Sequence, residues 1–172
     1  MIDLARFIRD VPDFPKKGIL FKDITPLLKD PEAFARSIDT LARRHRDDRI
    51  DAVAAVESRG FIFGGALAVR LGAGFVPIRK PGKLPHHTIS ETYSLEYGTD
   101  SIEIHRDAVK HGDRVLIVDD LLATGGTAGA AASLIARMGA KVVGASFLVE
   151  LTFLAGRAKL AEIPVFSIIS YE

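Results

Sequence analysis

The feature that most constrains the fold is a set of short apolar runs without polar alternation. These runs are Ala52–Val56, Phe75–Ile78, Val115–Val118, Val142–Val149 and Val165–Ile169. Segments of helical length alternate with them, namely Pro31–Arg44, Phe61–Leu71 and Thr127–Met138. Strands that are apolar on both faces need cover on both faces, as in a parallel sheet flanked by helices. The sequence therefore predicts an α/β fold with an open, mainly parallel β-sheet.

Size and composition narrow the function classes. A chain of 172 residues has the size of one domain, so we assign residues 1–172 to a single unit. The formal net charge is +1 with acids and bases mixed, which argues against a nucleic-acid partner. No apolar stretch reaches about 18 residues, so no membrane span is expected. The absence of cysteine excludes disulfides and thiol catalysis, and we expect a cytoplasmic protein.

Two segments depart from the strand and helix rhythm. Residues 79–98, named the flap here, contain two prolines, several polar residues and glycine. Long irregular excursions from a compact domain are usually functional lids, so we predict that the flap is mobile. Residues 11–29, named the hood, form a second irregular segment. We expect the hood to fold over an edge of the sheet.

The segment from Arg114 to Thr127 passes from a buried strand through a loop into a helix, where ligands bind in open α/β sheets. Its loop, named the phosphate loop, consists of Ala123, Thr124, Gly125, Gly126 and Thr127. The glycines let backbone N–H groups converge on an anion, and the threonines add hydroxyl donors. It lacks the lysine of a Walker loop and the glycine spacing of a dinucleotide site. The sequence predicts a phosphate site of another kind.

Two acids stand immediately before the phosphate loop. Asp119 and Asp120 would repel a phosphate placed on top of them, but they suit sugar hydroxyls or a nearby divalent cation. The alternative is a surface turn followed by a helix cap. Taken together, the anion loop and the acidic pair favour a phosphorylated sugar as the ligand.

This block, Val-Asp-Asp-Leu-Leu-Ala-Thr-Gly-Gly-Thr at Val118–Thr127, closely resembles the phosphoribosyl-pyrophosphate (PRPP) motif of type I phosphoribosyltransferases, in the form found in adenine-specific members. Further segments resemble that family's base-binding segment, its pyrophosphate-side loop and its flap, in the family's order. They are Phe14-Pro15 with Gly18–Pro26, then Glu57–Gly64, and then Arg79–Pro85 with Tyr93–Gly98. The resemblance extends over nearly the whole chain.

The resemblance implies a purine-salvage reaction. PRPP and adenine would give AMP and pyrophosphate, so the partners are small molecules and, as in the family, a second copy in a homodimer. Mg²⁺ would enter bound to PRPP through substrate oxygens and water, without a protein ligand cage. Two alternatives stay open: a relative that prefers hypoxanthine, guanine or xanthine, and a regulatory module that senses a nucleotide.

The resemblance also implies residue roles around PRPP. The phosphate loop would hold the 5-phosphate, and Asp119 and Asp120 would face the ribose hydroxyls. Arg59 would contact the pyrophosphate, a role that suits its planar guanidinium fork. Arg79 and Lys80 would meet the pyrophosphate as the flap closes.

Adenine and the reacting centre have their own implied residues. Glu96 aligns with the family's catalytic carboxylate. Phe21 would stack on the purine, and backbone groups around Leu20 and Lys22 would read its edge. Many relatives have arginine in place of Lys22 and aspartate in place of Glu57, so the side-chain contacts of these two residues stay open.

One basic run has a simpler interpretation. Arg43–Arg49 ends a predicted helix, where cations suit the helix dipole, and aspartates interrupt its charge. We therefore interpret it as a solvated helix end.

Overall fold

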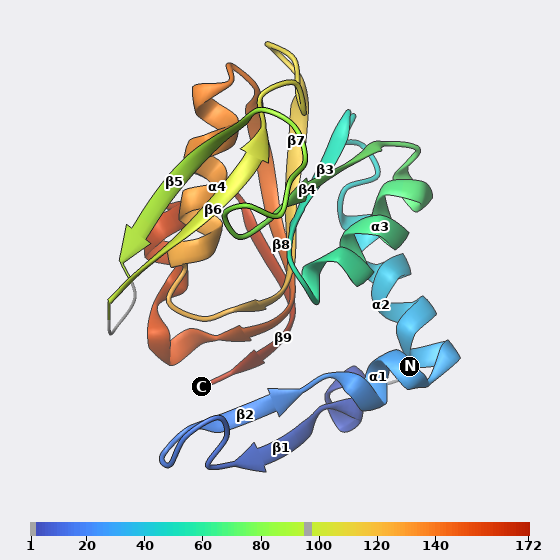
Figure 1. Cartoon of the computed structure of the whole chain (residues 1–172). Helices are drawn as coiled ribbons and strands as arrows, with labels where there is room; N and C mark the ends of the chain where they lie inside the picture. The colour runs from blue at the N-terminus through green and yellow to red at the C-terminus, as the bar shows by residue number, and fades with distance from the viewer. Residues whose placement is uncertain (1–2, 95–97) are drawn as a thin grey trace.

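A computed structural model of the chain describes residues 3–94 and 98–172. Its central sheet has five strands in the order β4-β3-β7-β8-β9, and each neighbouring pair is parallel (Figure 1). The strands are β3 (Ala52–Val56), β4 (Gly74–Ile78), β7 (Arg114–Leu122), β8 (Lys141–Leu151) and β9 (Val165–Tyr171). The predicted open parallel sheet is confirmed.

Helices cover both faces of this sheet. On one face lie α2 (Pro31–Arg44) and α3 (Gly60–Leu71), and on the other lies α4 (Gly126–Arg137) (Figure 1). Side chains of β7 alternate between two buried clusters. Val115 and Ile117 belong to the cluster around α4, whereas Leu116 and Val118 belong to the cluster around α2 and α3. Burial on both sides explains why the strands show no polar alternation.

The ends of two helices follow local signals in the sequence. Asp30 precedes α2 and accepts a hydrogen bond from the Ala33 amide at 2.8 Å, with Pro31 at the first helical position. Gly72 ends α3 with a φ of 68°, the left-handed conformation that favours glycine. In residues 3–94 and 98–172, no helix has the length and apolar character to cross a bilayer.

The flap is more regular than its sequence suggested. Strand β5 (Thr88–Ser94) pairs antiparallel with β6 (Thr99–His105) in a separate two-stranded sheet. The described part of the flap thus lies outside the main sheet, as expected, but 7 of its residues form a strand whose partner begins just after residue 98. Ile102 and Ile104 of β6 are fully buried in the α4 cluster, which packs strand β6 against the domain.

The hood is also ordered. Strands β1 (Arg9–Pro12) and β2 (Leu20–Asp23) form an antiparallel hairpin that leads into α1 (Thr25–Lys29). The hairpin lies beside the end of edge strand β9 (Figure 1). The described residues also form the 3-10 helices η1 (Leu4–Phe7), η2 (Thr152–Leu154) and η3 (Gly156–Leu160).

Candidate active site

The residues predicted to bind PRPP lie at one edge of the sheet. The strands are parallel, so their carboxyl ends meet at the same edge, which is where ligands bind in open α/β folds. The loop after β3 carries Arg59, the loop after β4 carries Arg79 and Lys80, and the end of β7 carries the acidic pair and the phosphate loop. The topology therefore brings these segments to one edge.

The phosphate loop is held by a close backbone contact. Gly125 has a φ of 78° and precedes α4 as its N-cap. A Cβ on Gly125 would lie 2.2 Å from the carbonyl oxygen of Gly156, and a Cβ on Gly156 would lie 2.2 Å from that of Ala123. Only glycine fits at both positions. The sequence analysis identified Gly125 but missed Gly156, because nothing near Gly156 in the sequence indicates this contact.

An ion pair with one buried partner anchors the segment behind the phosphate loop. Glu150, at the end of β8, is 3% exposed and accepts two bonds of 2.7 Å from the Arg157 guanidinium in η3. The hydrogen bond from Arg157 lowers the pKa of Glu150 despite burial. Such a bidentate pair fixes direction as well as distance, so η3 is a firm support for the loop.

The acidic pair is enclosed by the start of α3. Asp120 is 5% exposed, and its Oδ2 is 2.8 Å from Nε of Arg59. A Cβ on Gly60 would lie 2.7 Å from Oδ1 of Asp119, so this glycine lets α3 approach the carboxylate. Burial raises the pKa of both carboxyls, and the charge of Asp120 raises that of Asp119 further, whereas Arg59 opposes the shift. One buried carboxyl and one half-buried carboxyl therefore lie near a single cation, Arg59.

Arg59 also joins the acidic pair to the hood. Its guanidinium carbon lies 5.1 Å from the ring centroid of Phe21, within the range of a cation–π contact. Phe21 in turn packs edge-on against Phe14, with 5.1 Å between the ring centroids. The structure thus brings Phe21, predicted for the base, beside Arg59 and Asp120, predicted for the pyrophosphate and the ribose.

Leu20 and Lys22, the other two hood residues predicted to bind adenine, differ in how firmly their side chains are held. Leu20 is 50% exposed at the start of β2. The ammonium of Lys22 is 2.7 Å from Oδ1 of Asp10 and 3.8 Å from the ring centroid of Tyr171. The Lys22 side chain is thereby held against its neighbours, which leaves the backbone as the group predicted to read a purine edge.

Glu57 connects the loop after β3 to the base of the flap. Its carboxylate accepts bonds from Nη2 of Arg79 at 3.1 Å, from Nζ of Lys83 at 3.2 Å and from the Lys80 amide. Burial tends to raise the pKa of Glu57, but these hydrogen bonds outweigh it and the pKa is lowered. Glu57, whose contacts the sequence left open, thus holds the cationic side chains of Arg79 and Lys83 together at the base of the flap.

The β5–β6 hairpin contacts the phosphate loop through Tyr93, which the sequence analysis did not assign to binding. Oγ1 of Thr127 donates to the Tyr93 hydroxyl at 3.1 Å. That hydroxyl is 3.4 Å from Oδ2 of Asp100, and the same carboxylate oxygen binds the ammonium of Lys80. A Cβ on Gly126 would lie 3.0 Å from the Tyr93 ring, so the ring covers this glycine.

Glu96, the predicted catalytic carboxylate, lies outside the described residues. The acids that are described offer no cage for a metal: residues 3–94 and 98–172 contain no group of three or more His, Asp or Glu side chains that could hold one. Asp120 is moreover engaged by Arg59.

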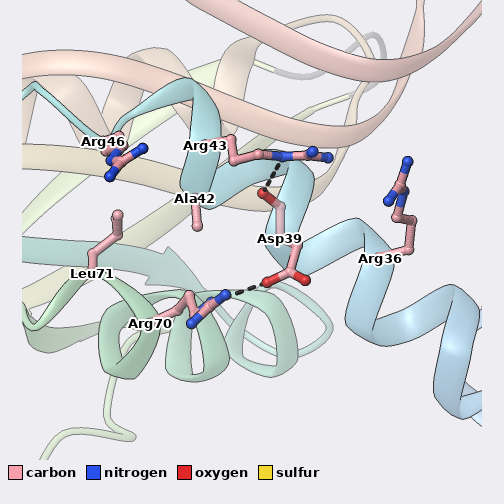
Figure 2. A pocket seen from close by; sticks show the side chains of 7 residues that line it. All are labelled: Arg36, Asp39, Ala42, Arg43, Arg46, Arg70 and Leu71. Atoms are coloured by element: carbon pink, nitrogen blue, oxygen red, sulfur yellow. Dashed lines mark hydrogen bonds and ion pairs between the residues drawn. The ribbon is translucent and has the colours of Figure 1, made fainter.

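A basic groove lies on the surface away from the sheet edge that carries the predicted site. A groove of about 440 Å³ between α2 and α3, named the arginine groove, is lined by Arg36, Asp39, Ala42, Arg43, Arg46, Arg70 and Leu71 (Figure 2). Asp39 accepts from Nε of Arg70 at 3.0 Å, and its carbonyl oxygen accepts from Nε of Arg43 at 3.3 Å. These residues come from α2, from α3 and from the turn after α2, and not from the carboxyl edge of the sheet. The arginine groove is therefore separate from the predicted site.

Known proteins share this architecture and sequence. The chain matches the phosphoribosyl transferase domain family over residues 26–167. The adenine phosphoribosyltransferase of Solibacter usitatus is 59% identical over 172 residues, which are 100% of this chain and 99% of the relative. The crystal structure of adenine phosphoribosyltransferase from Thermoanaerobacter pseudethanolicus matches with a TM-score of 0.96 and 58% identity over 98% of each chain. The Saccharomyces cerevisiae enzyme, complexed with an imino-altritol bisphosphate and adenine, matches with a TM-score of 0.90 and 44% identity over 95% of each chain.

Proposed function

Since the chain belongs to the phosphoribosyl transferase family, and within it to the adenine phosphoribosyltransferases, we propose how its residues transfer the 5-phosphoribosyl group from PRPP to adenine. The products are AMP and pyrophosphate. The observation that carries the residue assignment is the position of Arg59, which lies against both Phe21 and Asp120. The groups proposed to bind the base and the sugar, Phe21 and Asp120, therefore contact the same side chain.

The phosphate loop holds the 5-phosphate of PRPP. Its backbone N–H groups and the amino end of α4 supply donors without a mobile side chain, and the hydroxyls of Thr124 and Thr127 add two more. Asp119 and Asp120, which precede the phosphate loop in β7, accept hydrogen bonds from the ribose hydroxyls. The close contact between Gly125 and Gly156 supports this assignment, because it fixes the loop's shape before a ligand arrives.

Arg59, Arg79 and Lys80 bind the pyrophosphate group. Magnesium bound to PRPP through phosphate oxygens and water neutralises part of that group's charge. Arg59 suits the remaining charge because its fork can bind two phosphate oxygens at once. Arg79 and Lys80 follow β4 at the same edge of the sheet, where Glu57 holds them together.

Adenine binds in the hood. Phe21 stacks on the purine face, and the backbone of Leu20 and Lys22 reads its edge. The contact between the Phe21 ring and Arg59 supports this proposal, because the residue assigned to the base lies beside a residue assigned to the pyrophosphate. Such an arrangement brings the two reactants into attacking geometry.

Glu96 serves the chemical step. Pyrophosphate leaves the anomeric carbon, a centre with oxocarbenium character develops, and purine N9 attacks it. A carboxylate near the base stabilises the developing positive charge and manages the purine's proton. The flap closes over this centre because an open oxocarbenium-like carbon would react with water.

Product identification tests the function directly. Purified protein is mixed with Mg²⁺, PRPP and one purine base at a time, and the nucleotide formed is identified by chromatography. We expect AMP from adenine and none without Mg²⁺. Activity on hypoxanthine but not on adenine would overturn the assignment, and ligand binding without any turnover would favour a nucleotide sensor.

Glu96→Ala tests the catalytic assignment. We expect kcat to fall about 10²- to 10⁴-fold with little change in the Kd for PRPP, the usual effect of losing a general acid–base group. Steady-state kinetics and isothermal titration calorimetry measure the two quantities. Glu162→Ala, which removes an exposed carboxylate in another part of the chain, serves as the control.

A homodimer is the assembly we propose. Ile62 and Val69 stand seven residues apart on one face of α3 and are 41% and 85% exposed, and Phe75 of β4 is 40% exposed nearby. An exposed apolar surface of this kind favours association with a second copy. Light scattering should give the mass of a dimer, and Val69→Asp should shift it towards the monomer. A wild-type monomer at all concentrations would contradict the proposal.

We also propose that the protein works in the cytoplasm. PRPP carries several phosphate charges, which make its transfer through an apolar bilayer very costly. The enzyme that consumes it should therefore share the compartment in which it is made. Cell fractionation with an antibody against the chain measures this directly.

A further inference from the structure

A chain of side-chain contacts runs across the β5–β6 hairpin from the phosphate loop to the base of the flap. Thr127 donates to Tyr93, Tyr93 contacts Asp100, and Asp100 binds Lys80. Tyr93 and Asp100 are cross-strand partners in the register of the hairpin. The two ends of the chain are residues that we assign to the two phosphorylated ends of PRPP.

Both end residues are engaged by hairpin side chains in this structure. The hydroxyl of Thr127, assigned to the 5-phosphate, is directed to the Tyr93 oxygen. The ammonium of Lys80, assigned to the pyrophosphate, is directed to the Asp100 carboxylate. In each case the hairpin supplies an oxygen of the kind that the substrate would supply.

We propose that Asp100 and Tyr93 are positioning residues that hold Lys80 and Thr127 until PRPP exchanges for them. The proposal rests on the PRPP-binding roles given under Proposed function. Pyrophosphate displaces the Asp100 carboxylate from Lys80, and the 5-phosphate displaces the Tyr93 hydroxyl from Thr127. The two exchanges are coupled, because Tyr93 and Lys80 contact the same oxygen of Asp100.

Exposure determines how costly the exchange is. The side chains of Lys80 and Asp100 are 40% and 30% exposed, so water screens their attraction. An ion pair of this kind is weak enough that a more highly charged anion can replace it. Asp100 and pyrophosphate are moreover both anions, so they compete for Lys80 and repel each other.

The competition gives the test a definite sign. Asp100→Asn keeps the side chain's shape but removes its charge. We expect PRPP with Mg²⁺, and pyrophosphate with Mg²⁺, to bind about two- to fivefold more tightly, the range set by a partly exposed ion pair. If Asp100 were merely structural, the variant would bind PRPP equally or less tightly, and that result would overturn the proposal.

Lys80→Ala distinguishes a failure of this inference from a failure of the assignment of Lys80 to the pyrophosphate. We expect Lys80→Ala to weaken PRPP binding and to abolish the gain from Asp100→Asn in the double variant. Unchanged PRPP binding by Lys80→Ala would overturn the assigned role of Lys80, and this inference with it. A loss by Lys80→Ala without a gain by Asp100→Asn would overturn this inference alone. A gain that persists in the double variant would show a general charge effect and also overturn it.

Tyr93→Phe tests the other end with ribose 5-phosphate as the probe. Freed from Tyr93, Thr127 should bind the probe about twofold more tightly, since one neutral hydrogen bond no longer has to be exchanged. Unchanged or weaker binding would contradict the proposal at this end.

Matched controls lie in and near the same hairpin. The hydroxyl of Thr92 is 2.8 Å from that of Ser101, in the residue pair next to Tyr93 and Asp100. Thr92→Val therefore perturbs the hairpin without touching Lys80 or Thr127. Asp107→Asn removes an exposed charge just beyond β6. Neither should tighten PRPP binding; if either does so as much as Asp100→Asn, the proposal fails.

Discussion

The phosphate loop and the arginine groove both offer donors to an anion, yet they are built in opposite ways. The loop relies on backbone N–H groups and hydroxyls at a turn fixed by Gly125 against Gly156. The groove carries four guanidinium groups on two helices and the turn after α2, and among the described residues its single ion pair joins Arg70 to Asp39. The comparison predicts that the converging, rigid donors of the loop bind a phosphate group better than the more numerous positive charges of the groove do.

Gly125→Ala should have the largest effect and tests whether rigidity matters in the loop. The new Cβ would collide with the Gly156 carbonyl oxygen. The alanine would also have to adopt a φ of 78°, which is unfavourable for a residue with a side chain. We expect the free energy of unfolding to fall by about 1–3 kcal/mol and kcat/KM for PRPP to fall by more than about tenfold. Urea denaturation and kinetics measure these changes.

Gly65→Ala is the matched control for that substitution. Gly65 lies within α3, and a Cβ there would meet nothing within 4 Å. It should leave kcat/KM unchanged and raise stability slightly, because alanine favours the helix. If both variants behaved alike, the shape of the phosphate loop would not be what PRPP requires.

Asp120→Asn should come next and compares one acid in each region. It leaves Arg59 without its carboxylate partner and removes an acceptor for the ribose hydroxyls. We expect kcat/KM for PRPP to fall by about tenfold, as when one member of a partly buried, hydrogen-bonded charge pair is lost. Asp39→Asn makes the same change in the arginine groove, where it should not alter kcat/KM. Equal losses in the two variants would break the comparison.

The effect of pH on the free energy of unfolding should be smaller than these effects. It tests the packing at the end of α2, the helix that carries part of the arginine groove. Helix α2 is capped by His45, which is 3% exposed and lies 2.7 Å from Asp48 and 2.6 Å from Ser146. Burial lowers the pKa of His45, although Asp48 opposes the shift. The folded state thus prefers the neutral ring, so its contribution is full above about pH 6.5 and is lost as the pH falls towards the folded pKa.

Denaturation at a series of pH values checks this sign. Wild-type protein should lose more stability between pH 7.5 and pH 5.5 than His45→Gln does. His87→Gln, in which an exposed histidine of the flap is replaced, should follow the wild type. A parallel decline in His45→Gln and wild type would show that other groups cause the loss.

Substitution of the groove's arginines should have the smallest effect. Arg36 and Arg43 lie seven residues apart on one face of α2, and both line the groove (Figure 2). The double variant Arg36→Ala, Arg43→Ala should keep kcat/KM within about twofold and stability within about 0.5 kcal/mol, as for solvated surface residues. A larger loss of activity would mean that the groove takes part in function.

The sequence predicted those features whose cause is local. Strand β7 is apolar on both faces, so its burial could be inferred, and the phosphate loop stands within one continuous segment. Strand β5 was not predicted, because prolines and a glycine directly precede it and only Ile89 and Tyr93 supply the apolar positions of its alternating pattern. The contact of Gly125 with Gly156 could not be inferred, since it joins residues from different parts of the chain. The roles of Glu96 and the other assigned residues stay predictions.

The back-to-back packing of Gly125 and Gly156 has a consequence for how this chain can change. Neither position can gain a side chain unless the opposite backbone retreats, so each of these two stretches of sequence restricts what the other can contain. A deletion or redesign after β8 would therefore alter PRPP binding even though it leaves every assigned binding residue in place. The tolerance of η3 to insertion thus measures how firmly the loop is held from behind.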